Sequence, residues 1–379
     1  MNKYSREFLL EKADLVLNKL MNLENRQFDK NENPWSGKAG RDFGIKTWDW
    51  PQGVGLYGME KLQKLYGDTR YDGFFADWIR RNQEEGLPSA NINTTAPYNM
   101  VLAMARRYDD PLFKDMCTER AEWLMSGLSK TEEGGFQHVT TDLYDKNGTI
   151  QNEGQLWVDT LFMAVMFLAQ AGVAYGRKEW IDEAVYQIQI HIKYLYEKRC
   201  GLLHHGWSFI RKDNFGGIFW ARGNSWFTYG ILELMDILAE HIGQPQKRLL
   251  TYTFLSQVDA LEKLQEEDGL WHTILDDPSS YEEVSGTAAI AAALFKAIRI
   301  GVLDESHLPY AERALDGIIK NITEDGAVLQ VSAGTAIGLD AEHYKNIIID
   351  LMPYGQSMVV LTLTEALEYY DGVEREEEY

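Results

Sequence analysis

The sequence predicts an all-α fold, an (α/α)6 barrel in which two concentric rings of helices are joined by loops. Two observations support this prediction: a loop motif recurs ahead of apolar helical segments, and amphipathic segments alternate with those apolar ones. Alternation at a period of two residues, which is typical of strands, is scarce. Six repetitions of an inner and an outer helix would close such a barrel.

The recurring motif joins a glycine-containing turn and a loop of aromatic and polar residues to a helix of small and apolar residues. Its six copies occupy residues 48–55, 91–98, 155–164, 219–226, 283–288 and 353–357. Successive copies lie roughly 45 to 70 residues apart, which leaves room for a helical hairpin because helices average about 11 residues. We expect each copy to open an inner helix.

Amphipathic segments between these copies predict the outer helices. Their apolar residues recur at intervals of three and four, with charges on the other face. They cover residues 177–196, 246–267 and 308–322, and one further amphipathic helix is expected over residues 4–23, ahead of the first copy. Because every motif loop precedes an inner helix, the loops should converge on the barrel end where inner-helix N-termini gather, and free N–H groups there favour an anion.

The chain is expected to form a single domain over residues 1–379, with a short disordered acidic tail at about 373–379. No linker interrupts the repeat, and no segment has the apolar length of a secretory signal or a membrane span. The two cysteines, Cys117 and Cys200, are too few for a disulfide framework. We therefore expect a cytoplasmic protein.

The net charge of the chain and the sequence motifs that it lacks exclude several classes of binding partner. The formal net charge of −21 argues against nucleic acid and membrane partners, whereas a small anion held by local donors is compatible with it. Dinucleotide, phosphate-loop and serine-hydrolase motifs are absent, and the histidines lack the spacing of a zinc helix. No metal or cofactor is expected.

Asp159 is the leading candidate for a catalytic residue. It precedes the strongly apolar segment 160–171, which predicts a buried helix, and it follows Trp157 closely. The alternative is that Asp159 only caps this helix. Tryptophans in the motif loops favour a sugar ligand, although indoles also pack barrel ends; they are Trp48, Trp50, Trp157, Trp207, Trp220, Trp226 and Trp271.

Several motifs together resemble the unsaturated rhamnogalacturonyl hydrolases, glycoside hydrolase family 105. These motifs are Trp-Val-Asp at 157–159, Gly-Gly-Phe-x-His at 134–138, His-His-x-Trp at 204–207, Phe-Trp-Ala-Arg at 219–222 and Glu-x-Ser-Gly at 283–286. The resemblance implies an (α/α)6 barrel and a small oligosaccharide substrate that ends in a 4,5-unsaturated uronic acid. Asp159 would protonate C4 and assist addition of water at C5, late in the breakdown of pectin-like polysaccharides.

The resemblance also implies substrate contacts. Arg222 would hold the uronate carboxylate, and His205 and Trp226 would contact the ring. The other expected contacts are Trp48, Gln52, Asn93, His138, Trp157, Trp220 and Glu283. Asn93 stands where related hydrolases carry a second Asp, and an amide cannot raise the pKa of Asp159 by like-charge repulsion. Either Asn93 is only a hydrogen-bonding contact, or the activity differs in substrate or rate.

Three other functions remain open from the sequence. An inverting glycosidase would pair Asp159 with Glu283 or Glu153, because it needs two carboxylates about 6.5 to 9.5 Å apart. A sugar epimerase would use a histidine pair, His205 and His272. A barrel that binds carbohydrate without turnover is the third. Galacturonyl and glucuronyl substrates, and monomer and dimer, are not distinguished.

Overall fold

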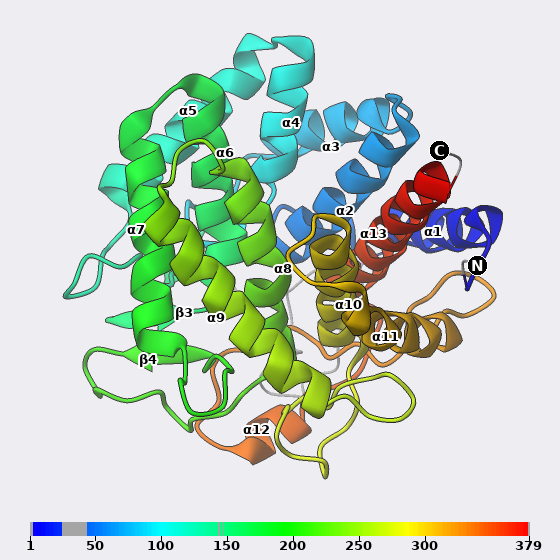
Figure 1. Ribbon diagram of the computed structural model, residues 1–379. Helices are drawn as coiled ribbons and strands as arrows, with labels where there is room; N and C mark the ends of the chain where they lie inside the picture. The colour runs from blue at the N-terminus through cyan, green and yellow to red at the C-terminus, as the bar shows by residue number, and fades with distance from the viewer. Residues whose placement is uncertain (1–2, 25–43, 143–144, 146, 378–379) are drawn as a thin grey trace.

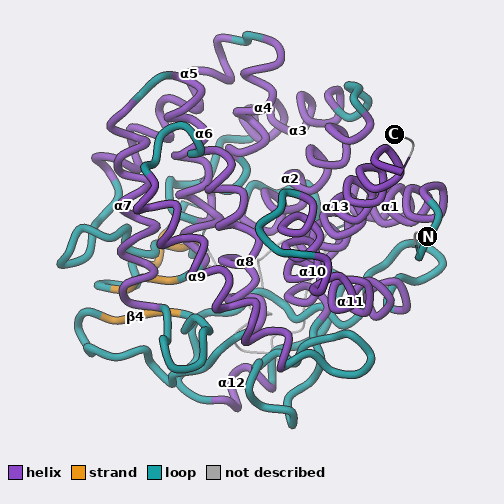
Figure 2. Tube along the Cα trace, in the orientation of Figure 1, coloured by secondary structure: helices purple, strands orange, loops and turns teal. Residues whose placement is uncertain are grey.

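The computed structural model describes residues 3–142, 145 and 147–377, except for 25–43 (Figure 1). Twelve long helices confirm the predicted all-α barrel, and strands are short (Figure 2). The inner ring comprises α2 (Trp50–Tyr66), α4 (Tyr98–Tyr108), α6 (Met166–Tyr175), α8 (Ala221–Ile237), α10 (Val284–Arg299) and α13 (Pro353–Glu377). The outer helices are α1 (Arg6–Met21), α3 (Asp72–Glu84), α5 (Pro111–Glu122), α7 (Lys178–Leu195), α9 (Gln244–Lys263) and α11 (Leu308–Lys320).

The inner helices form a closed ring. In chain order α2, α4, α6, α8, α10 and α13 each pack against the next, and α13 packs against α2. Their residues are almost all buried; α10, with the sequence VSGTAAIAAALFKAIR, shows why, since its small side chains allow close contact with both neighbours. The outer helices have one buried face, as the apolar spacing predicts.

Each of the six motif copies lies at or just before the start of an inner helix, as predicted. In the third copy helical structure begins at Asp159, after a short extended piece, and continues through a π-helix, η3 (Leu161–Val165), into α6. A short 3-10 helix, η1 (Asn93–Thr95), precedes α4 in the second copy. π-Helical turns are rare and occur frequently beside functional sites.

The loops at the N-terminal end of the inner ring carry the short strands. β1 (Thr140–Thr141) pairs with β2 (Thr149–Ile150), and β3 (Gln155–Trp157) pairs with β4 (Gly206–Ser208), all antiparallel. The helix α12 (Ala341–Lys345) lies at this same lower end of the molecule in Figure 1. These loops, together with η1, the start of α2 and the helical segment from Asp159 through η3, build the walls of the pocket described below.

The opposite end of the ring holds a buried charge cluster. Glu233 of α8 is paired with Lys61 of α2 and Lys296 of α10, and Tyr57 also donates to it. Burial raises the pKa of Glu233, but the two ammonium groups lower it more, so the net pKa lies well below its usual range. The cluster therefore joins three inner helices at the end remote from the pocket.

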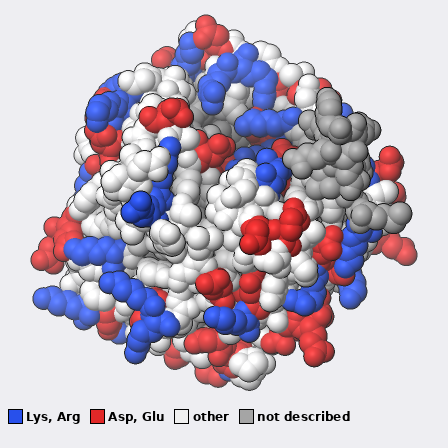
Figure 3. Space-filling view, viewed as in Figure 1, with Lys and Arg blue, Asp and Glu red and all other residues white. Residues whose placement is uncertain are grey.

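Charged side chains of both signs are interspersed on the face shown in Figure 3. In the part of the chain that the structure describes, no helix is long and apolar enough to cross a membrane. The acidic tail expected at about 373–379 falls on the last turn of α13 and on residues 378–379, which lie outside the described residues. Its disorder stays a prediction, as does the single-domain boundary.

Candidate functional site

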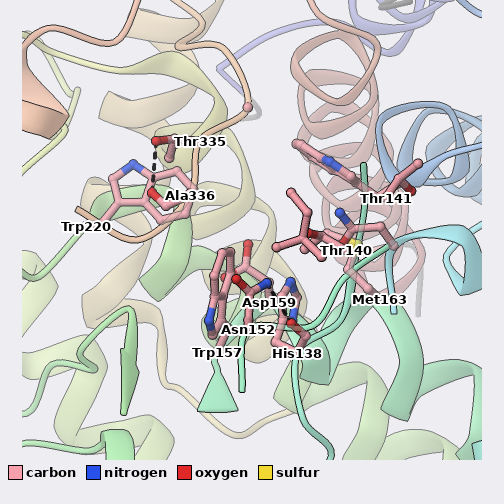
Figure 4. A pocket seen from close by; sticks show the side chains of 14 residues that line it. His138, Thr140, Thr141, Asn152, Trp157, Asp159, Met163, Trp220, Thr335 and Ala336 are labelled. Carbon is pink, nitrogen blue, oxygen red and sulfur yellow. Dashed lines mark hydrogen bonds between the residues drawn. The ribbon is translucent and has the colours of Figure 1, made fainter. Parts of the chain in front are cut away.

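A cavity of about 270 Å³ opens at the end of the barrel where the inner helices begin. Figure 4 shows Asp159 beside Trp157 and His138, while Trp220, Thr335 and Ala336 form another side of the pocket. Its lining comprises Trp50, Asn93, His138, Thr140, Thr141, Ile150, Asn152, Trp157, Asp159, Met163, Trp220, Gly334, Thr335 and Ala336. The structure thus brings together five of the predicted site residues: Asn93, His138, Trp157, Asp159 and Trp220.

Strand pairing places a histidine against Asp159. Trp157 of β3 lies opposite Gly206 of β4, and the N–H of Val158 donates to the carbonyl of His205 over 3.0 Å. Glycine is needed at 206, because a Cβ there would lie 2.8 Å from the carbonyl oxygen of Leu156 on the paired strand. This register fixes the distance between the two segments of the chain that carry Asp159 and His205.

Asp159 and His205 form the centre of the site. His205 Nε2 lies 3.2 Å from Asp159 Oδ2, and neither atom has a hydrogen-bond partner elsewhere in the described part of the chain. The Asp159 side chain is 15% exposed and faces the pocket, whereas His205 is buried behind it. Burial raises the pKa of Asp159, but His205 and, less strongly, His138 lower it, and the net pKa lies below its usual range.

Aromatic rings flank Asp159 on two sides. His138 stacks on Trp157 with ring centroids 4.2 Å apart and an interplanar angle of 8°, and its Nδ1 lies 2.8 Å from Thr160 Oγ1. Burial lowers the pKa of His138 to about 3, so this ring is neutral. Trp220 packs against His205 with ring centroids 4.4 Å apart. Broad apolar faces beside a carboxyl group suit a sugar ring, whose C–H faces pack on indoles.

Asn93 lines the same pocket as Asp159. Its side-chain amide makes no hydrogen bond within the described residues, while its backbone carbonyl accepts from Ala96 at the start of α4. An amide left free in this position can donate to and accept from a ligand. A role for Asn93 as a hydrogen-bonding contact to the substrate stays a prediction.

Three other predicted contacts do not line the pocket. Trp48 is buried, stacks on Trp78 at 4.9 Å and donates through Nε1 to the carbonyl of Thr94. Trp226 is buried against Phe162 of the inner ring. The amide of Gln52 is buried and donates to the carbonyl of Gly44. These side chains hold the ends of the helices together instead of reaching a ligand.

Arg222 and Glu283 are also withdrawn from the pocket. Arg222 is fully buried between the rings of Trp220 and Tyr354, at 4.5 and 4.8 Å from their centroids. Its guanidinium lies 3.5 Å from Glu283, which accepts from Gly286 N and caps α10. The expected contact between Arg222 and a uronate carboxylate is therefore not available in this structure.

The guanidinium of Arg222 instead holds a loop that lines the pocket. It donates to the carbonyl of Ser332 and to that of Ala333, both over 2.8 Å. The next residues, 334–336, form one side of the cavity. Arg222 therefore positions a wall of the site without touching its interior.

Several lining residues escape prediction from the sequence. Trp50 is among the motif tryptophans expected near a sugar ligand, whereas Met163 is not predicted. Met163 follows Asp159 by one helical turn, and this spacing could have indicated it. The residues Thr140, Thr141, Ile150 and Asn152 come from the hairpin β1–β2 and its continuation, and residues 334–336 come from the loop held by Arg222. No periodicity marks these loops. Over the described ranges, no group of three His, Cys, Asp or Glu side chains has the geometry of a metal site.

Comparisons with known proteins agree with this geometry. The model of Glycosyl Hydrolase Family 88 matches residues 21–370. The chain is 30% identical over 323 residues to the unsaturated rhamnogalacturonyl hydrolase YesR of Bacillus subtilis (strain 168), a match that covers 85% of this chain and 90% of that protein.

Two solved structures resemble the whole chain. A possible member of the GH105 family from Salmonella enterica serovar Paratyphi A superimposes with a TM-score of 0.89 and 35% identity, covering 97% of this chain and 96% of the other. Another possible member of that family, from Klebsiella pneumoniae, gives a TM-score of 0.89 and 34% identity, with 98% and 95% covered.

Proposed function

Since the chain belongs to Glycosyl Hydrolase Family 88 and to the unsaturated rhamnogalacturonyl hydrolases that its motifs resemble, we propose that it removes a 4,5-unsaturated uronic acid from oligosaccharides left by polysaccharide lyases. The proposed substrate is of the rhamnogalacturonyl or galacturonyl type. One observation carries the chemical part of the proposal: Asp159 is the one carboxylic acid among the described residues that line the pocket.

One carboxyl group is enough for hydration of the double bond. Asp159 gives its proton to C4 while a water oxygen bonds to C5, and the proton that this water loses returns to Asp159. The bond between C5 and the ring oxygen of the resulting hemiketal then breaks, leaving a ketone at C5 and a hemiacetal at C1. The hemiacetal collapses to an aldehyde and releases the neighbouring sugar. In total one water is consumed, and Asp159 returns to its starting state.

The alternatives receive less support from the geometry. An inverting glycosidase needs a second carboxylate, but Glu283 is buried as a helix cap and Glu153 is exposed outside the pocket. An epimerase would need His272 beside His205, whereas His272 lies against Glu266 and is not among the lining residues. Hydration of the double bond needs neither a second carboxylate nor a second histidine.

A panel of lyase products tests this function. The conjugated double bond absorbs in the ultraviolet, so hydration is followed as loss of absorbance. We expect loss with unsaturated rhamnogalacturonan disaccharide, and rates across galacturonyl and glucuronyl products will rank the substrates. Binding of these sugars without loss on any of them, by folded protein, would indicate a carbohydrate-binding barrel instead of an enzyme.

The rate should fall as the pH rises. Asp159 must hold a proton to donate it, and its pKa in the free protein lies below its usual range, so kcat/KM should decline with increasing pH through the acidic region. A bound uronate adds a negative charge near Asp159 and raises its pKa. We therefore expect the decline in kcat at higher pH than the decline in kcat/KM. A rate that increases with pH through the same region would contradict Asp159 as the acid.

Asn93→Asp should move this profile. A second carboxylate in the pocket raises the pKa of Asp159 by like-charge repulsion, so the decline in kcat/KM shifts to higher pH. The same charge repels the uronate, so KM should rise. Asn93→Leu is the matched control, because it removes the amide without adding charge and should leave the position of the decline unchanged. Equal profiles for both variants would show that Asn93 is too remote from Asp159 to influence it.

A further inference from the structure

A buried tyrosine lies behind the pair formed by Asp159 and His205. Residues 332–345, which we call the strap, begin at the carbonyls held by Arg222 and end in α12. Gly334, Thr335 and Ala336 of the strap line the pocket, and Tyr344 of α12 is fully buried. The hydroxyl of Tyr344 lies 2.8 Å from His205 Nδ1, on the ring nitrogen opposite the one that faces Asp159.

The other hydrogen bond of the Tyr344 hydroxyl determines which atom donates in its contact with His205. The N–H of Gly338 donates to the Tyr344 hydroxyl oxygen over 3.1 Å, so that oxygen already accepts one bond. Its own proton has one acceptor among the described residues, His205 Nδ1. If His205 carried a proton on Nδ1 instead, the buried phenol proton would be left without a partner, which is unfavourable for a buried donor.

We propose that Tyr344 is a positioning residue that holds His205 in the tautomer with its proton on Nε2, the ring nitrogen that lies 3.2 Å from Asp159 Oδ2. This inference rests on the proposed function for its catalytic consequence, but the tautomer itself is a property of the protein alone. With this tautomer the N–H of His205 lies on the ring nitrogen 3.2 Å from the Asp159 carboxylate, and the Tyr344 hydroxyl both accepts from Gly338 and donates to His205.

The contact between Tyr344 and His205 joins the pocket wall formed by the strap to the pair of Asp159 and His205. Thr335 Oγ1 lies 2.7 Å from His343 Nε2, and His343 is the neighbour of Tyr344 in α12. Tyr281 donates to the carbonyl of Tyr344 over 3.2 Å. The strap is thus a hydrogen-bonded unit that presents Thr335 to a ligand on one side and Tyr344 to His205 on the other.

Nitrogen-15 NMR of protein labelled at histidine tests the tautomer without any substrate. The signals of His205 are assigned by their absence from His205→Gln. We expect Nδ1 of His205 to show the shift of an unprotonated nitrogen and Nε2 that of a protonated one, and Tyr344→Phe to change this pattern. A proton on Nδ1 in the unmodified protein would overturn the proposal, whether or not the enzyme hydrates unsaturated sugars.

The kinetics of Tyr344→Phe test the catalytic consequence of the proposed tautomer. Tyr344→Phe allows the other tautomer, which withdraws the N–H from the Asp159 carboxylate and raises its pKa. We expect the limiting kcat at acidic pH, where Asp159 is protonated in both proteins, to fall about 10-fold because the support of His205 is lost, the scale of one buried hydrogen bond. KM should stay within about twofold, and the decline of rate with pH should shift upward. On the His205→Gln background Tyr344→Phe should have little further effect, since both changes remove the same interaction.

Tyr354→Phe is the matched control. Tyr354 is also buried and donates to the strap, at the carbonyl of Ser332, but it does not contact His205. We expect its pH profile and histidine spectrum to match those of the unmodified protein. An equal pH shift in both tyrosine variants, or additive losses on the His205→Gln background, would assign Tyr344 to general support of the strap and overturn the positioning role.

Discussion

Asp159→Asn is expected to lower kcat by roughly 10²-fold or more while the barrel stays folded. An amide cannot give a proton to carbon, and the loss of a positioned acid typically costs about 10²–10⁴-fold. Asn has nearly the size of Asp and also suits the start of a helix, so the helical segment that begins at residue 159 should persist. Initial rates of absorbance loss and circular dichroism measure the two parts of this expectation.

Glu153→Gln is the matched control for this variant. Glu153 precedes Asp159 by six residues in the same segment but is exposed and does not line the pocket. Its substitution should leave kcat unchanged, while calorimetry should show that Asp159→Asn still binds the disaccharide. Near-normal turnover by Asp159→Asn would remove Asp159 from the mechanism, and a large loss in Glu153→Gln would revive the two-carboxylate glycosidase.

Arg222→Leu is expected to lower the free energy of unfolding by about 3–5 kcal/mol, because it leaves the buried carboxylate of Glu283 without its cation. It also frees the carbonyls of Ser332 and Ala333 and so loosens the strap. Denaturant titration measures the stability. Because Arg222 acts through the strap, binding of an unsaturated uronate and of its neutral methyl ester should weaken by similar factors.

The comparison of acid and ester separates two roles for Arg222. The family resemblance implies that it holds the substrate carboxylate, in which case the acid would lose much more affinity than the ester. Arg222→Lys is the control, since it keeps the charge but not the planar group that donates to two carbonyls. A selective loss for the acid in Arg222→Leu, with stability unchanged, would contradict the positioning role.

The fold and the position of Asp159 at the pocket could be predicted because their signals are local. Apolar spacing separates inner from outer helices, and the apolar segment after Asp159 marks the start of a buried helix. The motif loops all precede inner helices, so a single topological argument places Asn93, Trp157, Asp159 and Trp220 at the same end of the barrel.

The direction of a side chain within that end could not be predicted. Trp48 and Trp226 lie in copies of the same motif as Trp157 and Trp220, yet they pack inward, because a one-residue change around a helix start turns a side chain from the pocket to the core. For Arg222 the buried position was decided by two carbonyls of the strap, 110 and 111 residues away in sequence.

Contacts between remote segments explain the remaining omissions. His205 is predicted to contact the sugar ring, but it is buried and does not line the pocket. It meets Asp159 through the register of β3 and β4, which depends on two short extended pieces with no strand-like pattern. Tyr344 reaches His205 from a segment 139 residues later, and nothing in its local sequence marks it. Such long-range pairs are fixed by packing of the whole barrel.

Hydration in deuterium oxide, followed by proton NMR, tests the central claim most directly. The unsaturated disaccharide is mixed with the protein, and the products are recorded from the first turnovers. The proposal predicts that deuterium from Asp159 appears at C4 as the double bond disappears, at the same rate as the neighbouring sugar is released. Release of an unsaturated monosaccharide with its double bond intact would contradict it, because attack would then have occurred at the anomeric carbon.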